Sequence, residues 1–140
     1  MSLFSVRRCV RPLAVLCAML LLTACAATGK KTETIDERVN GRWAALFAND
    51  IETAYGYLTP GYRSSVTLQQ YRRALENQAV RWTSAKYIDS KCEESTCEVK
   101  VQVGFTVYGA LPGVKTFSTE QYADETWILV DGQWYMVPPR

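Results

Sequence analysis

The sequence contains no histidine, the side chain that most often performs acid–base catalysis near neutral pH. Histidine is also a common zinc ligand, and the 140 residues include only five cysteines that could replace it. The sequence has no phosphate-binding glycine loop, no nucleophile elbow and no Cys-x-x-Cys motif. We therefore expect no metal, no cofactor and no catalytic residue, and we predict that the protein is not an enzyme.

The chain has no large excess of positive or negative charge. The chain has 16 basic and 14 acidic residues, a formal net charge of +2. Three of the basic residues are Arg7, Arg8 and Arg11, so the remainder is almost balanced. Nucleic-acid-binding proteins concentrate basic residues in a patch or stripe. The composition therefore predicts no nucleic-acid partner.

No apolar run is long enough to cross a bilayer as a helix. The longest run extends from Leu13 to Leu22 and directly follows the three arginines. A bilayer core requires about 20 apolar residues in a helix, roughly twice this length. A short apolar run after positive charges is typical of a secretory signal peptide. We predict that this segment is cleaved and does not span the membrane.

The end of the apolar run is Leu22, Thr23, Ala24 and Cys25. This tetrad resembles the lipobox of bacterial lipoproteins. The resemblance implies cleavage after Ala24, a diacylglycerol on the Cys25 thiol and an acyl chain such as palmitate on the new amine. Several acyl chains hold a protein stably on a membrane. The alternative is an ordinary signal peptide that happens to precede a cysteine.

The residues after Cys25 are alanines, whereas enteric lipoproteins retained in the inner membrane carry an aspartate there. By resemblance to that sorting rule, we expect an anchor in the outer membrane with the domain facing the periplasm. Cys92 and Cys97 are then the only cysteines left. An oxidising compartment permits a disulfide between them, and two ligands are too few for a structural zinc site.

We divide the chain into a signal peptide (1–24), a lipidated cysteine with its tether (25–34) and one domain (35–140). Apolar residues at helical spacing predict a helix from Ile35 to Tyr55, interrupted at Asn49, where Glu52 suggests a new cap. Capping signals also occur at Thr59-Pro60 and at Thr67, which begins a helix ending near Gln78.

From Val80 onward, apolar residues recur at every second position, a spacing that is typical of strands. The expected strands are 80–91, 99–107, 117–130 and 133–137, with Asp131-Gly132 as a tight hairpin turn. Helices followed by strands predict an α+β domain. We expect N-terminal helices packed on a curved antiparallel sheet of about four strands, preceded by the cleaved signal helix.

Two segments carry a family resemblance, RWAALFANDIETAYGYLTPGYR and ETWILVDGQWYMV. With the predicted layout, they resemble the nuclear transport factor 2-like superfamily, which includes ketosteroid isomerase and SnoaL-like proteins. The resemblance implies a cone-like sheet wrapped around helices. It also implies a cavity that some members use for catalysis with a histidine–aspartate pair or an aspartate base.

The four tryptophans and eight tyrosines could line such a cavity or fill the core of a small domain. We choose Trp82, Tyr108, Tyr122 and Asp124 as the candidate pocket, noting that Tyr122 and Asp124 share a strand face. Asp124 is equally consistent with an ordinary edge-strand charge. A lyase or isomerase with an aspartate base is the least favoured alternative.

The sequence thus supports two main hypotheses. The first is a lipid-anchored outer-membrane lipoprotein whose domain is a non-enzymatic interaction module for envelope proteins. The second is a binder of a small apolar ligand or lipid.

Overall fold

A computed structural model describes residues 32–111 and 113–139. Within these residues, four helices are followed by four strands. The predictions for the signal peptide and for Cys25 lie outside the described residues. The elements are α2 (Ile35–Phe47), α3 (Ile51–Gly56), α4 (Pro60–Ser65), α5 (Leu68–Glu76), β1 (Val80–Cys92), β2 (Thr96–Leu111), β3 (Val114–Val130) and β4 (Gln133–Val137).

Side-chain caps fix where the helices begin. Thr34 and Glu37 form a capping box at the start of α2, and Thr67 and Gln70 form one at the start of α5. The Thr59 side chain accepts a hydrogen bond from the Tyr62 amide, so α4 begins at Pro60, as predicted.

The predicted cap at Asn49 is wrong by one residue. Asp50 is the N-cap of α3, and its carboxylate accepts a hydrogen bond from the Thr53 amide at 3.1 Å. Asn49 instead has a φ of 55°, in the left-handed region that asparagine tolerates. This conformation separates α2 from α3.

The four strands form one antiparallel sheet in the order β1-β2-β3-β4. Asp131 and Gly132 connect β3 to β4, both with positive φ, as a type I′ hairpin turn requires. Residues alternate between the two faces of each strand. On β2, Cys97, Val99 and Val101 are buried, whereas Glu98 and Lys100 are exposed.

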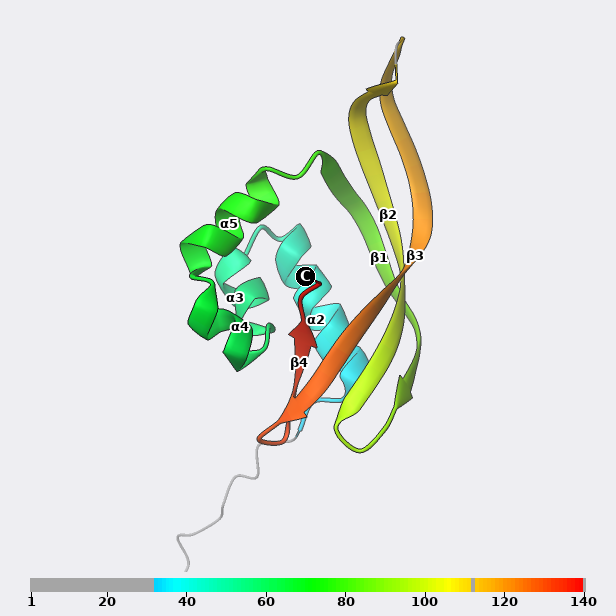
Figure 1. Cartoon of the computed structure of the whole chain (residues 1–140). Coiled ribbons are helices and arrows are strands. Elements are labelled where there is room, and N and C mark those ends of the chain that lie inside the picture. Colours follow the sequence, from blue (N-terminus) through cyan, green and yellow to red (C-terminus); the bar gives the residue numbers. More distant parts are fainter. Residues whose placement is uncertain (1–31, 112, 140) are drawn as a thin grey trace, which may run out of the picture. The chain divides into compact units, whose positions relative to one another are not determined.

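The buried face of the sheet carries the hydrophobic core. Figure 1 shows the four helices together on one side of the long strands. Val39 and Trp43 from α2 and Leu58 from the α3–α4 connection belong to the same buried cluster as Val99 and Trp127. We call the helix-covered side of the sheet the inner face and the opposite side the outer face.

The segment between α3 and α4 covers the free edge of β4. Leu58 forms a parallel bridge with Met136. The Thr59 amide donates to the Met136 carbonyl at 3.1 Å, and the Met136 amide donates to the Tyr57 carbonyl at 2.8 Å. These bonds occupy backbone groups that an edge strand would otherwise expose.

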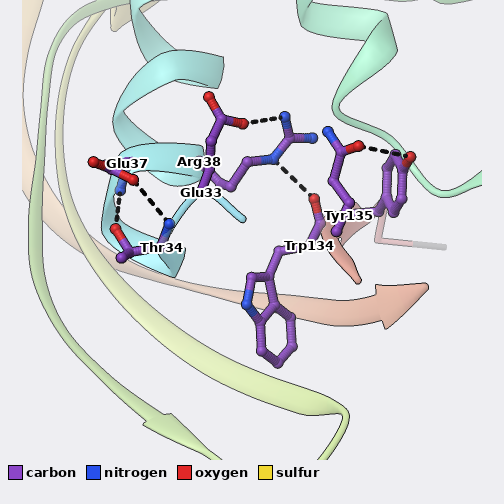
Figure 2. A network of polar contacts seen from close by, with 7 residues as sticks. Glu33, Thr34, Glu37, Arg38, Trp134 and Tyr135 are labelled. Carbon is purple, nitrogen blue, oxygen red and sulfur yellow. Dashed lines mark hydrogen bonds and ion pairs between the residues drawn. The ribbon is translucent and has the colours of Figure 1, made fainter. Parts of the chain in front are cut away.

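Arg38 links the start of α2 to β4. Figure 2 shows its guanidinium beside Glu33 and the backbone of Trp134. Nε donates to the Trp134 carbonyl at 3.0 Å, and Nη1 pairs with Glu33 at 2.9 Å. The guanidinium also lies 4.1 Å from the centre of the Tyr57 ring, a cation–π contact. Arg38 therefore has a structural role.

The predicted cone-like fold is wrong. The longest strand, β3, has 17 residues, whereas α3, α4 and α5 have six, six and nine. The domain is dominated by a four-stranded antiparallel sheet with short helices and is not the cone-like arrangement. An order of helices followed by strands is shared by many α+β folds, so that order alone could not define the architecture.

Candidate functional site

A pocket of about 680 Å³ lies between α5, α2 and the inner face of the sheet. Volumes of 300–1,000 Å³ are usual for small-molecule sites. Most of its wall is apolar, and residues that follow β4 complete it. The main lining side chains are Arg42, Trp43, Leu58, Tyr62, Tyr71, Leu75, Trp82, Val103, Phe105, Ala123, Glu125, Met136 and Pro138.

Local structure explains how these residues meet. Trp43 lies on the face of α2 that packs on the sheet, and Tyr71 is the buried residue of α5. Trp82 pairs with Phe105 in the register of β1 and β2, which places both on the inner face. The rings of Trp43 and Trp82 meet edge to face with centroids 5.3 Å apart. This contact gives one wall of the pocket a rigid aromatic surface.

A buried polar cluster contributes Arg42, Trp43 and Glu125 to the wall of the pocket. Glu125 on β3 accepts hydrogen bonds from Arg42 Nη1 at 3.0 Å, Trp43 Nε1 at 3.0 Å and Trp127 Nε1 at 2.9 Å. Arg42 and Glu125 are each only 6% exposed. A buried charge requires such partners, and removing one member of a buried pair typically costs about 3–5 kcal/mol. The ion pair therefore fixes α2 on β3.

Two atoms of this region lack a hydrogen-bond partner among the described residues. They are Nε of Arg42 and the hydroxyl of Tyr71, and both are buried. Burial raises the pKa of Tyr71, and the charge of Arg42 and a hydrogen-bonding interaction with it oppose that rise only in part. Tyr71 is a neutral phenol at physiological pH, and its hydroxyl group lies beside Arg42.

The residues selected from the sequence are only partly brought together. Trp82 and Asp124 belong to the pocket wall, but Asp124 is exposed and pairs with Lys100 in the register, on the outer face. Tyr108 and Tyr122 are 60% and 64% exposed and do not line the pocket. Tyr122 and Asp124 do share a face, but it is the face away from the helices.

Cys92 and Cys97 form a disulfide that joins opposite residues at the ends of β1 and β2. Within 32–111 and 113–139, no group of three or more metal-ligating side chains lies together. The helices of that same region include none that is both long and apolar enough to cross a membrane.

Sequence patterns did not predict Arg42, Tyr71 or Glu125 as residues of the pocket wall. One signal for Glu125 was available, because it falls between Ala123 and Trp127 at the inward positions of its strand. A charged residue at an inward strand position predicts a buried partner of opposite charge. The partner itself, Arg42, lies on a distant helix and carried no comparable signal.

Comparison with known proteins gives likeness in fold alone. No family model and no curated protein sequence matches the chain. The solution structure of a SEC-C motif-containing protein from Rhodopseudomonas palustris matches with a TM-score of 0.58 and 15% identity, over 75% of this chain and 76% of that one.

A second match is the crystal structure of a SEC-C motif-containing protein from Psychrobacter arcticus. Its TM-score is 0.54 and its identity is 12%, over 77% of this chain and 60% of that one. The chain therefore spans less than two thirds of this second protein. The two similarities show a shared fold and leave the activity open.

These neighbours correct the family resemblance. They are SEC-C motif-containing proteins, not members of the nuclear transport factor 2-like superfamily or SnoaL-like proteins. The sequence resemblance rested on element order and on aromatic positions, and these features are too general to identify a superfamily at such low identity. The lipobox resemblance involves residues 22–25, outside the described residues.

Proposed function

We propose that this protein is a lipid-anchored envelope protein whose domain binds a small, largely apolar molecule in the pocket between α5 and the inner face of the sheet. The observation that carries this proposal is the pocket itself. Its size is that of a small-molecule site, and its wall combines apolar side chains with a few polar groups. We propose binding without turnover, since Glu125 is held by three donors within its own chain.

The proposed location rests on sequence alone. The arginines, the short apolar run and the tetrad ending at Cys25 favour export and lipidation. The alanines that follow favour the outer membrane, with the domain in the periplasm. The membrane would then be the first partner of the protein, through the lipid on Cys25.

A second candidate function is the docking of an envelope protein. It is favoured by three exposed aromatic side chains, Tyr108, Phe117 and Tyr122, on the β2–β3 hairpin. Exposed aromatic residues are enriched at protein interfaces. Tyr108 and Tyr122 lie on the outer face, so this function would leave the pocket free.

The pocket proposal is tested with N-phenyl-1-naphthylamine, an uncharged apolar dye that fluoresces on entering an apolar site. We expect saturable binding of one dye per chain. Ala74 lines the pocket from α5 with an exposed side chain, so Ala74→Trp should obstruct the open side of the pocket and weaken dye binding at least tenfold. Ala44 is exposed on α2 away from the pocket wall, so Ala44→Trp is the matched control and should bind like the wild type.

Equal dye binding by both variants would place the dye elsewhere and argue against the pocket as the binding site. The absence of saturable binding by the wild type would reject the binding proposal and favour the docking function. Unfolding midpoints of the two variants should be measured in parallel, so that a loss of binding is not confused with a loss of structure.

A further inference from the structure

The polar groups of the pocket limit which molecules it can accept. Arg42 and Tyr71 both line the wall, and both are more than nine-tenths buried. Arg42 Nε and the Tyr71 hydroxyl make no hydrogen bond of good geometry among the described residues, and the hydroxyl, which also interacts with Arg42, can donate or accept. Native proteins rarely leave buried polar atoms unpaired, so each such atom requires an explanation. A ligand oxygen atom that binds both groups would provide one.

The charge of Arg42 is already balanced. Its Nη1 donates to Glu125, which is itself buried and receives two further hydrogen bonds from tryptophans. A ligand carboxylate would therefore be a second anion beside one cation. Removing such an excess charge from water is costly unless a new partner compensates it. The pocket thus disfavours a free acid.

A cationic ligand fits no better. Its charge would enter beside the Arg42 guanidinium, whose carboxylate partner is already occupied. The nearby Tyr71 phenol stays neutral, because burial raises its pKa, and so it supplies no negative charge. An uncharged oxygen can accept from Arg42 Nε and pair with the Tyr71 hydroxyl without adding charge to the pocket.

We propose that the ligand is an uncharged amphiphile that places a hydroxyl or other neutral oxygen against Arg42 and Tyr71. Its apolar part lies along Leu75, Trp82 and Val103. This inference rests on the proposed function and specifies the chemical class of the ligand. It distinguishes a neutral alcohol-like molecule from a free fatty acid or an alkylamine of the same length.

The test uses 1-octanol, octanoate and octylammonium, which share an eight-carbon chain and differ in their head groups. Each is titrated at pH 7 into the full chain reconstituted in lipid vesicles, with empty vesicles as the blank for partitioning. The readout is tryptophan fluorescence, since Trp43 and Trp82 line the pocket. We expect 1-octanol to bind about tenfold more tightly than either charged probe.

Two variants locate the preference. Tyr71→Phe removes one hydroxyl and keeps the ring, so the affinity for 1-octanol should fall about fivefold while the weak octanoate binding stays unchanged. Tyr108→Phe makes the same chemical change at a residue that is 60% exposed and outside the pocket wall, and it should bind all three probes like the wild type.

Octanoate or octylammonium binding at least as tightly as 1-octanol would overturn the inference while leaving the pocket as an apolar binding site. Unchanged 1-octanol affinity in Tyr71→Phe would also overturn it. If no probe binds and the apolar dye does not bind either, the proposed function itself fails. The comparison of probes on the wild type requires no variant, so it remains valid even if Tyr71→Phe does not fold.

Discussion

Glu125 connects two elements that lie far apart in the sequence, β3 and α2. Its carboxylate holds Arg42 and Trp43 from α2 and Trp127 from β3, with all donor–acceptor distances near 3.0 Å. Buried charge pairs add little net stability when compared with apolar replacements, but they specify which groups must meet. In this protein the pair determines where α2 lies on the sheet and makes the polar end of the pocket electrically neutral.

Tyr71 lowers the stability of the folded protein as the pH becomes alkaline. Burial raises its pKa above the ordinary value of 10.0, so the folded state keeps the phenolic proton at pH values where the unfolded state releases it. This contribution to the free energy of unfolding is complete below the unfolded pKa. It is lost as the pH rises through the folded pKa. We expect a shallower alkaline loss of stability in Tyr71→Phe.

Urea unfolding of both proteins between pH 8 and pH 11 measures this difference. Tyr108→Phe is the control, because it removes the same hydroxyl group from a residue that is 60% exposed. Identical pH profiles for the wild type and Tyr71→Phe would show that Tyr71 titrates alike in the folded and unfolded states.

At the residue scale the sequence predicted Trp82 in the pocket wall but not the polar groups around it. Tyr122 and Asp124 were chosen because they share a strand face, and alternation indeed places them together. The phase of that alternation is set by Ala123, Glu125 and Trp127, which face the helices. A one-residue error of phase exchanges the two faces of a strand, so the chosen pair came from the outer face.

The β1–β2 hairpin has a covalent closure at one end. Cys92 and Cys97 face each other across the strand pair and form a disulfide. Closing so short a loop stabilises the folded state by about 2 kcal/mol in the chain-entropy treatment. We expect dithiothreitol to lower the unfolding midpoint of the wild type by several degrees. Differential scanning calorimetry with and without the reductant measures the shift.

The matched variant for this experiment is Cys92→Ser, since Cys92 is exposed whereas Cys97 is fully buried. Its midpoint should equal that of the reduced wild type and should not respond to dithiothreitol. A wild-type midpoint that stays constant after both thiols are shown to be free would mean that the bond adds no stability.

At the element scale, the ends of helices and the hairpin turn were predicted well where a single residue type marks the boundary, as a cap or turn residue does. Two helices begin where the sequence predicted, at Thr59 with Pro60 and at Thr67 with Gln70. The predicted turn forms at Asp131 and Gly132. These signals act within a few residues. The predicted cone-like fold was wrong because the architecture depends on element lengths and on packing between distant segments. No local sequence pattern contains that information.

The whole molecule combines this domain with an N-terminal segment that lies outside the described residues. If Cys25 carries the lipid, cells given labelled palmitate should incorporate it into the wild type, and the protein should sediment with membranes. Cys25→Ser should lose both the label and the membrane association. Cys17→Ser changes a cysteine within the apolar run, so it should keep both properties.

Continued labelling of Cys25→Ser would show that another residue carries the lipid, and a wild type without label would contradict the lipid anchor. Loss of labelling in both serine variants would indicate that export itself had failed. Fractionation of inner and outer membranes in the same cells tests the expected location.

The pairing of Leu58 with Met136 also has a consequence for the order in which the chain acquires its structure. The Tyr57 carbonyl and the Thr59 amide obtain their β-type partners only from Met136, which is synthesised long after them. The helices can form early from local contacts, but this closure requires a contact between distant parts of the chain. During synthesis, Leu58 lacks the β4 strand with which it pairs until Met136 has been added to the chain. The contact between Leu58 and Met136 can therefore form only after β4 has been synthesised.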